Sequence, residues 1–239
     1  DLIAIDIGQT VSAGSIQLIA MGENIGVRTS APLLAAADIL IASRQTVLLD
    51  GAVNAGRDVE FYNIGAMDSA LSASVEAGRH LRFVGTGLDL TADASLSAVG
   101  DLGLGFVGDN SDGWTALRNA GRIEAGGALS MSGLRMGLNT GVIRSGGTMN
   151  AAAASVRAPD HQRHLTGAHS SRAIDDERAP VRMLNAGTMS AGLDLFVNAV
   201  DNEGGSLVAA RDLFLWQEPQ RSAACGTASP HPTMTRRTT

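Results

Sequence analysis

The chain has 239 residues, of which 29 are Gly and 3% are aromatic, and its formal net charge is −6. Its basic residues are all Arg and do not cluster on the repeats, which argues against nucleic acid as the main partner because phosphate binding needs clustered cations. The longest apolar run, 32–42, is too short and too rich in Ala to span a bilayer. The single Cys225 excludes an internal disulfide but leaves the redox compartment open.

A nine-residue pattern, apolar-x-Ala-Gly-x-x-apolar-x-apolar, returns along the chain with variations. Successive first residues lie 22, 20, 22, 21, 27, 20, 46 and 18 positions apart. A period near 20 residues without helical spacing predicts a stacked repeat protein. In chain order the copies begin at Val11, Leu33, Val53, Val75, Leu96, Ile123, Ile143, Met189 and Leu207.

One copy predicts two short strands joined by a corner. In the copy that begins at Val53, the odd steps hold Val53, Ala55, Val59 and Phe61, and polar residues hold the even ones. Alternation with period two is typical of a half-buried strand. The Ala-Gly-Arg-Asp between the two halves predicts a tight corner, because Gly tolerates positive φ and Asp bonds to nearby backbone.

Such a unit cannot bury its apolar face alone, so the copies are expected to stack at the strand-pairing distance of about 4.8 Å. The sequence therefore predicts a right-handed parallel β-helix (β-solenoid) of about 20-residue coils, with roughly nine or ten coils and a length of about 45 Å. A barrel or sandwich would place strands about every 8 to 12 residues without returning the same nonapeptide. Leucine-rich repeats would need helical returns, whereas these returns are rich in Gly. The first and last positions of the copies should form two aliphatic columns: Val11, Leu33, Val53, Val75, Leu96, Ile123, Ile143, Met189 and Leu207, and Leu18, Ile41, Phe61, Phe83, Leu104, Met131, Ala151, Val197 and Leu215.

Four segments follow from where the repeat holds and where it breaks. We expect β-helix repeats in 1–156 and 183–216, an irregular excursion or degenerate coil in 157–182, and a disordered tail in 217–239. The chain starts in mid-pattern at Asp1, without an initiator Met or a signal peptide, so we expect a fragment of a longer protein.

Two polar segments contain residue types that can bind metal ions. His161, His164 and His169 lie in the excursion, but no Cys accompanies them and the nearby carboxylates have no recognised spacing. Asp109 and Asp112 match neither the EF-hand loop nor the calcium-binding nonapeptide repeat. Solvated loop and turn residues are the simpler interpretation, so no metal or cofactor site is predicted.

Polar residues at one corner of the coils are the remaining candidates. Asp58, Asp101, Asp194 and Asp212 share a repeat position, which His80 also occupies. These residues either line a groove or bond to backbone, and corner Asp usually does the latter. β-Helix lyases and hydrolases use converging acids with a basic partner, which single corner acids do not supply. We therefore predict no catalytic residues and no enzyme, with a β-helix polysaccharide lyase or hydrolase as the alternative.

A longer motif, Asn-x-Gly-x-Ile-x-Ala-Gly-Gly-x-Leu-x-Leu, begins at Asn119 and returns in part at Asn139 and Asn185. In these residues the chain resembles the shaft repeats of filamentous haemagglutinin-like exoproteins, the large bacterial proteins exported by two-partner secretion. That family includes adhesins, haemolysins and contact-dependent growth-inhibition toxins. The resemblance covers about 1–216 apart from the excursion.

The resemblance implies a non-catalytic structural and adhesive shaft. The expected location is extracellular and associated with the cell surface. The expected partners are a host-cell or bacterial surface receptor or glycan and, for the parent protein, an outer-membrane two-partner secretion transporter. The family's Asn-Pro-Asn secretion motifs do not occur in this sequence, which contains no Asn-Pro.

Overall fold

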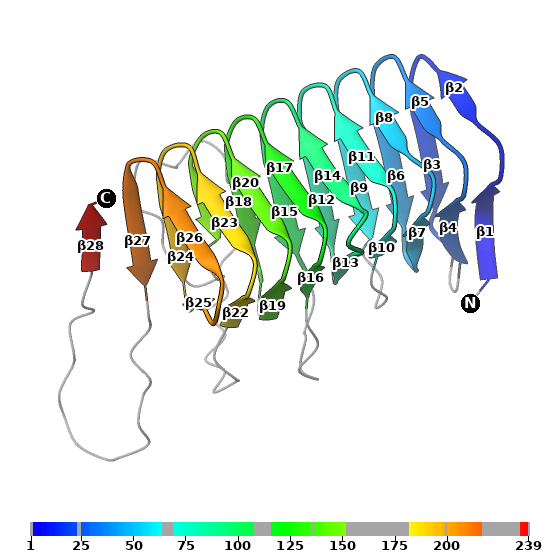
Figure 1. The fold of residues 1–239 in the computed structure, drawn as a ribbon. Helices are drawn as coiled ribbons and strands as arrows, with labels where there is room; N and C mark the ends of the chain where they lie inside the picture. Colours follow the sequence, from blue (N-terminus) through cyan, green and yellow to red (C-terminus); the bar gives the residue numbers. More distant parts are fainter. Residues whose placement is uncertain are drawn as a thin grey trace, which may run out of the picture.

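The computed structural model describes residues 2–22, 25–63, 69–107, 116–134, 136–151, 182–198, 200–216 and 235–238. Within these ranges every regular element is a β-strand (Figure 1). The chain winds through nine coils, and each coil contributes one strand to each of three sheets, named A, B and C. Equivalent strands of successive coils run parallel, so the sheets form the three walls of a β-solenoid. The predicted all-β parallel β-helix is confirmed.

The strands are short, between two and six residues. Sheet A contains β1 (Leu2–Ile7), β4 (Ile25–Thr29), β7 (Val47–Leu49), β10 (Ser69–Leu71), β13 (Leu88–Leu90), β16 (Leu117–Asn119), β19 (Met136–Asn139), β22 (Arg182–Asn185) and β25 (Val200–Asp201). Sheet B contains β2 (Val11–Ala13), β5 (Leu33–Ala35), β8 (Val53–Ala55), β11 (Ser74–Ala77), β14 (Ser95–Ala98), β17 (Arg122–Ala125), β20 (Val142–Ser145), β23 (Thr188–Ala191) and β26 (Ser206–Ala209). Sheet C contains β3 (Ile16–Ala20), β6 (Ile39–Ser43), β9 (Val59–Asn63), β12 (Leu81–Gly85), β15 (Leu102–Phe106), β18 (Leu129–Ser132), β21 (Met149–Ala151), β24 (Leu195–Asn198), β27 (Asp212–Trp216) and β28 (Thr235–Thr238).

The two columns predicted from the repeat are confirmed by the strand register. In sheet B, Val53 pairs with both Leu33 and Val75, and the pairing continues from coil to coil to Leu207. In sheet C, Phe61 pairs with Phe83 in the same way. The repeat therefore predicts correctly which residues of neighbouring coils pair, including across the 46 positions between Ile143 and Met189.

The third wall was missed by the sequence analysis, which assigned these residues to Gly-rich returns. Sheet A crosses those returns with strands such as β7 and β13, whose inward residues are apolar. Elsewhere the inward positions of sheet A hold Ser69, Asn119 and Gly137, so the apolar alternation is broken. Each coil therefore has three strands, where the repeat had suggested two.

The interior is a dry stack of aliphatic side chains. Leu33, Val53, Val75, Ile143 and Met189 all have 0% of their surface exposed. Complete burial of a side chain of this size stabilises the fold by about 1.5–3 kcal/mol relative to exposure. The buried apolar residues of the three sheets form one cluster that runs from the first coil to the last, so the core extends along the solenoid axis.

In the last four coils an asparagine ladder replaces one aliphatic column of sheet A, while the aliphatic column of sheet B continues. Asn119 Nδ2 donates to Asn139 Oδ1 at 2.8 Å, Asn139 Nδ2 to Asn185 Oδ1 at 2.6 Å, and Asn185 Nδ2 to Asn202 Oδ1 at 2.6 Å. The residue paired with Asn119 in the preceding coil is Leu90. Asn119 Oδ1 is buried and has no hydrogen-bond partner in the described structure. The ladder thus begins abruptly with an unsatisfied acceptor.

The corner glycines are needed for a different reason from the one predicted. Among the described glycines only Gly133 and Gly204 have positive φ. At Gly56, Gly78 and Gly126, by contrast, an added Cβ would overlap the carbonyl oxygen of the corresponding corner residue in the preceding coil. The corners are confirmed, but close approach between coils, rather than φ, requires glycine there.

The irregular segments lie mostly outside the described residues. Coil β19–β21 pairs directly with coil β22–β24 in all three sheets. The intervening residues 152–181, which include most of the expected excursion, lie outside the described structure. Most of the expected tail does too, but its residues Thr235–Thr238 form β28, which pairs with β27.

Candidate functional site

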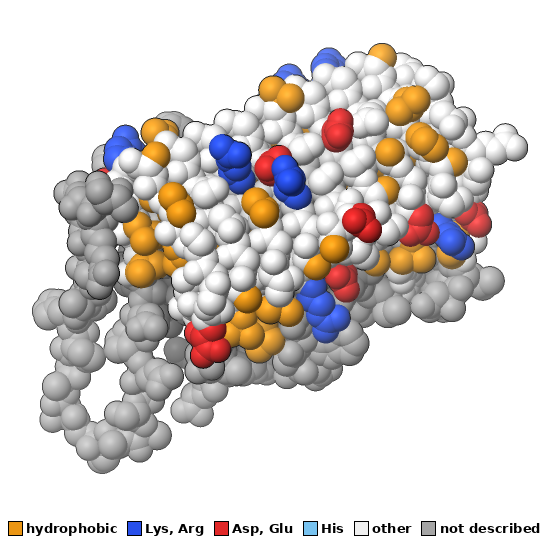
Figure 2. Space-filling model, viewed as in Figure 1, with side chains coloured by type: hydrophobic (Ala, Val, Ile, Leu, Met, Phe, Trp, Pro, Cys, Tyr) orange, Lys and Arg blue, Asp and Glu red, His pale blue; other side chains and the backbone are white. Residues whose placement is uncertain are grey.

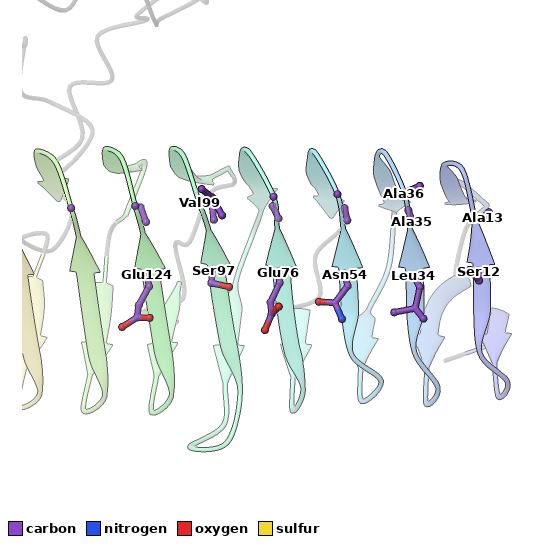
Figure 3. A pocket seen from close by; sticks show the side chains of 18 of the residues that line it. Ser12, Ala13, Leu34, Ala35, Ala36, Asn54, Glu76, Ser97, Val99 and Glu124 are labelled. Atoms are coloured by element: carbon purple, nitrogen blue, oxygen red, sulfur yellow. The ribbon is translucent and has the colours of Figure 1, made fainter.

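A shallow groove crosses the outer face of sheet B, with a volume of about 890 Å³ where it spans coils one to seven (Figure 3). We call it the sheet-B groove. A smaller hollow continues it over the last coils and shares Arg144 with it. Because the central residue of each strand points outward, one side chain per coil projects into the groove. In coil order this outward row reads Ser12, Leu34, Asn54, Glu76, Ser97, Glu124, Arg144, Ser190 and Val208.

The groove exists because small residues follow the outward row at the adjoining corner. Ala55 and Gly56 line it in one coil, and Ala125 and Gly126 line it in another. The stacking contacts described above forbid a larger residue at Gly56 and Gly126. The hollow is therefore a consequence of how the coils stack. On the face drawn in Figure 2, charged side chains are scattered on a largely white surface and apolar side chains form small patches.

The charges in the groove are few and only partly paired. Arg122 lies 3.4 Å from Glu124, between Nη1 and Oε1. Neither Glu76 nor Arg144 has an ion pair or side-chain hydrogen bond in the described structure. Asn54 Oδ1 is buried and lacks a hydrogen-bond partner among the described residues. The groove can thus offer an anion, Glu76, and a cation, Arg144, to a partner.

The spacing of the acids bears on hydrolytic chemistry. Glu76 and Glu124 project from strands two coils apart, so their backbones are separated by about 10 Å at the usual strand spacing. A retaining hydrolase needs carboxyl groups about 5–5.5 Å apart, and an inverting one about 6.5–9.5 Å. Ser97 stands between the two acids.

The corner acids that the sequence offered as site candidates lie beside this groove, and their carboxylates accept hydrogen bonds from backbone amides. Asp58 Oδ1 accepts from the amide of His80 at 3.2 Å, and Asp101 Oδ1 accepts from that of Ala128 at 2.8 Å. His80 continues the series with its ring, because Nδ1 accepts from the amide of Asp101 at 3.1 Å. Each of these side chains bonds to the equivalent corner of the next coil, which is the structural role expected of corner Asp.

Arginines reinforce the same corner. Arg79 Nε donates to Asp58 Oδ1 at 2.8 Å, and Arg211 Nε donates to Asp194 Oδ1 at 2.7 Å. These hydrogen bonds are the main reason that the pKa values of Asp58 and Asp194 lie below the ordinary value of 3.8, although partial burial opposes the shift. Asp212 holds the same register position one coil after Asp194. The side chains of this corner column therefore link one coil to the next by hydrogen bonds and ion pairs.

A tyrosine, Tyr62, lies between two charged side chains on the outer face of sheet C. Tyr62 donates its hydroxyl hydrogen bond to Glu60 Oε2 at 2.9 Å, and the guanidinium of Arg82 lies 5.7 Å from the Tyr62 ring centroid. Burial, and then the hydrogen bond with Glu60, raise the pKa of Tyr62. The cluster is self-paired and forms no cavity with the sheet-B groove.

The metal candidates His161, His164, His169, Asp109 and Asp112 lie outside the described residues. Within the described ranges no three His, Cys, Asp or Glu side chains are grouped so that they could hold a metal ion. In the same ranges no helix is long and apolar enough to cross a membrane. The sequence analysis missed the sheet-B groove, although its row of alternate residues could be read once the corner glycines were aligned.

No family model, curated protein or solved structure matches this chain.

Proposed function

We propose that the chain is a structural and adhesive shaft segment of a large, secreted, surface-associated bacterial exoprotein of the filamentous haemagglutinin-like kind. The observation that carries this proposal is the parallel pairing of three sheets, coil upon coil, through nine coils. Hydrogen bonds between coils run along the solenoid axis in all three walls, and aliphatic columns fill the space between them. Such an array is stiff, so it transmits force along the solenoid axis and keeps its two ends at a fixed separation.

The Asn-x-Gly-type repeats support the same family. In the structure each Asn of these repeats joins the ladder and the following Gly packs on the preceding coil. The motif therefore encodes coil stacking, which is the property that a shaft needs. On this proposal the parent protein reaches the cell surface through a two-partner transporter in the outer membrane.

We infer that the shaft meets its receptor or glycan at the sheet-B groove. The groove crosses at least seven coils, and a partner lying along it would contact one outward side chain per coil. The unpaired charges of Glu76 and Arg144 lie three coils apart, about 14 Å at the usual strand spacing. They would orient a partner that carries both charge signs or many hydroxyl groups.

The adhesive role is tested by the binding of the purified, labelled chain to host cells, bacterial cells and immobilised glycans. The double variant Glu76→Ala/Arg144→Ala should reduce binding about tenfold, the loss expected from roughly 1.4 kcal/mol. Its control, Glu203→Ala/Arg44→Ala, removes one acid and one base outside the groove and should bind normally. Equal binding by both variants would place the contact elsewhere, and no binding by the parent chain to any surface would contradict adhesion.

The polysaccharide lyase or hydrolase alternative draws on the two groove acids, Glu76 and Glu124. Activity on acidic polysaccharides, measured with and without calcium, separates the two classes. Turnover that is lost in both Glu76→Gln and Glu124→Gln would replace the shaft proposal with an enzyme.

The location is tested independently by labelling the parent protein on intact cells with and without its transporter. Retention of the protein inside cells that have the transporter would contradict export.

A further inference from the structure

A second outward row runs along the face of sheet A, which forms one side of the solenoid (Figure 1). Inward and outward side chains alternate along each strand, so every coil places one outward side chain at the same register position. We call this set the sheet-A row. In coil order it reads Asp6, Arg28, Leu48, Ala70, Asp89, Arg118, Leu138, Leu184 and Asp201.

The sheet-A row repeats an order of one acid, one arginine and two apolar residues. The first block of four begins at Asp6, the second at Asp89, and Asp201 holds the position of the next acid. Equivalent charges therefore lie four coils apart, about 19 Å at the usual strand spacing. The outward row of sheet B has no such order, since its first three residues are uncharged and two acids precede its arginine.

The side chains of this row are accessible to a partner. Leu138 and Leu184, which pair in neighbouring strands, are 38% and 39% exposed. The side chains of Arg118 and Asp89 are 52% and 46% exposed, and Arg118 Nη1 lies 4.0 Å from Asp89 Oδ2. An ion pair at this distance leaves both groups able to form closer contacts. The face thus combines an apolar patch with charges of both signs.

The order of the row is complementary to itself when one copy is turned end over end. A two-fold axis along the strand direction, between β13 and β16, brings the sheet-A faces of two copies together with their solenoid axes antiparallel. From coil two to coil nine, each charged residue of the row then faces a charge of opposite sign, and each apolar residue faces an apolar one. The facing pairs, each of which occurs twice, are Arg28 with Asp201, Leu48 with Leu184, Ala70 with Leu138, and Asp89 with Arg118.

Parallel arrangements of two copies lack this complementarity. If the copies run in the same direction and in register, each charge faces its own equivalent, so that Arg118 opposes Arg118 and Asp89 opposes Asp89. A shift of one coil places Arg28 against Leu48, where the guanidinium loses water without gaining an anion. The charge pattern therefore favours the antiparallel arrangement.

We propose that sheet A is a self-association surface whose partner is a second copy of this chain in antiparallel orientation. The contact strip is eight coils long, about 38 Å, and three residues wide, about 10 Å. It would cover roughly 400 Å² of each copy, about half of a standard interface, so the association should be reversible and concentration-dependent. The surface lies on the side of the solenoid, so it is present whatever coils precede or follow these nine. The inference is independent of the sheet-B groove and of any receptor.

Two charge variants test the pairing by sedimentation velocity. Arg28→Asp/Arg118→Asp makes every charge of the row acidic from coil two to coil nine, and Asp89→Arg/Asp201→Arg makes every one basic. Each variant alone should self-associate about tenfold more weakly than the unchanged chain, or less, because like charges then face each other. An equimolar mixture of the two should associate again, because each acid then faces an arginine. Restoration in the mixture also shows that both variants are folded.

The matched control is Arg82→Asp/Arg144→Asp, which makes the same change in net charge as the acidic variant but on the outer faces of sheets C and B. It should associate like the unchanged chain. An equal loss of association in this control would show that net charge alone is responsible, and a mixture that stays dissociated would rule out the proposed pairs. The proposal also fails if the unchanged chain is still a monomer at about 1 mM.

The direction of pairing is tested on beads. The chain contains no Lys, so amine-reactive beads hold it by its N-terminal amine alone. Chains on one bead then point the same way, whereas chains on two facing beads run antiparallel. Coated beads should therefore clump, and beads coated with Arg28→Asp/Arg118→Asp should not. Beads that stay apart although the free chain associates would overturn the antiparallel arrangement.

Discussion

The identity of a corner residue is determined by its contacts with the neighbouring coils. Gly78 is glycine because the carbonyl oxygen of Gly56 occupies the space that a Cβ would need. Asp58 is an acid because it receives the amide of His80 and the guanidinium of Arg79 from the next coil. Identity at these positions is thus set by residues about 20 positions away in sequence.

The first prediction concerns this close approach. Gly78→Ala should destabilise the chain by about 1–3 kcal/mol, the usual cost of forcing extra volume into a packed site. The matched control is Gly103→Ala, where the nearest atom to a new Cβ is Ser130 Oγ at an ordinary 3.6 Å. That control should be neutral or slightly stabilising. Urea unfolding followed by circular dichroism measures both, and equal stability of the two variants would contradict the stacking explanation.

The second prediction concerns pH. Because arginines lower the pKa values of Asp58 and Asp194 in the folded chain, both carboxylates add stability above the ordinary value of 3.8 and lose it as pH falls through that value and below. Acidification from about pH 5 to about pH 3 should therefore lower the urea midpoint. The variant Arg79→Ala/Arg211→Ala should flatten this dependence, whereas Arg144→Ala, which removes an unpaired arginine, should keep it. If the urea midpoint of the double variant depended on pH as strongly as that of the unchanged chain, the arginine–aspartate contacts would not contribute to stability.

An element of this fold is a strand of a few residues that has no stability of its own. Strands in sheets B and C could be predicted because apolar and polar residues alternate cleanly, as in Val53 to Phe61. Sheet A could not, because its inward positions include Thr29, Ser69 and Asn119, which are polar yet buried. Alternation of apolar and polar residues identifies strands only where the inward side chains are apolar. A sheet with polar inward residues, such as sheet A, is therefore not detected by this pattern.

The third prediction addresses that polar column. Asn139→Leu leaves Asn185 Oδ1 without its donor and removes the acceptor of Asn119 Nδ2, so it should cost about 1–3 kcal/mol. Replacing Asn119, Asn139 and Asn185 together by Leu removes donors and acceptors jointly. The triple variant should therefore cost less than three single ones, as measured by urea unfolding. Strict additivity would show that the ladder is not one cooperative unit.

At the scale of the whole molecule, the recurrence of a nonapeptide was sufficient to predict the solenoid, the stacking columns and the confirmed corners. The sheet-B groove could have been predicted from the same repeat, because the position before each Ala-Gly gives the outward row and the small Ala and Gly leave the hollow beside it. The antiparallel β28 was missed for another reason: it lies outside the repeat, so no periodic signal marks it.

The junction between Leu90 and Asn119 gives the rod a built-in fault plane. There the column changes from leucine to asparagine, and the first amide oxygen meets a hydrocarbon face with no hydrogen bond to offer. In a linear array the weakest junction decides where cooperativity breaks. Under tension or denaturant, sheet A should open first at this plane, because the aliphatic columns of sheets B and C continue across it whereas the column of sheet A does not.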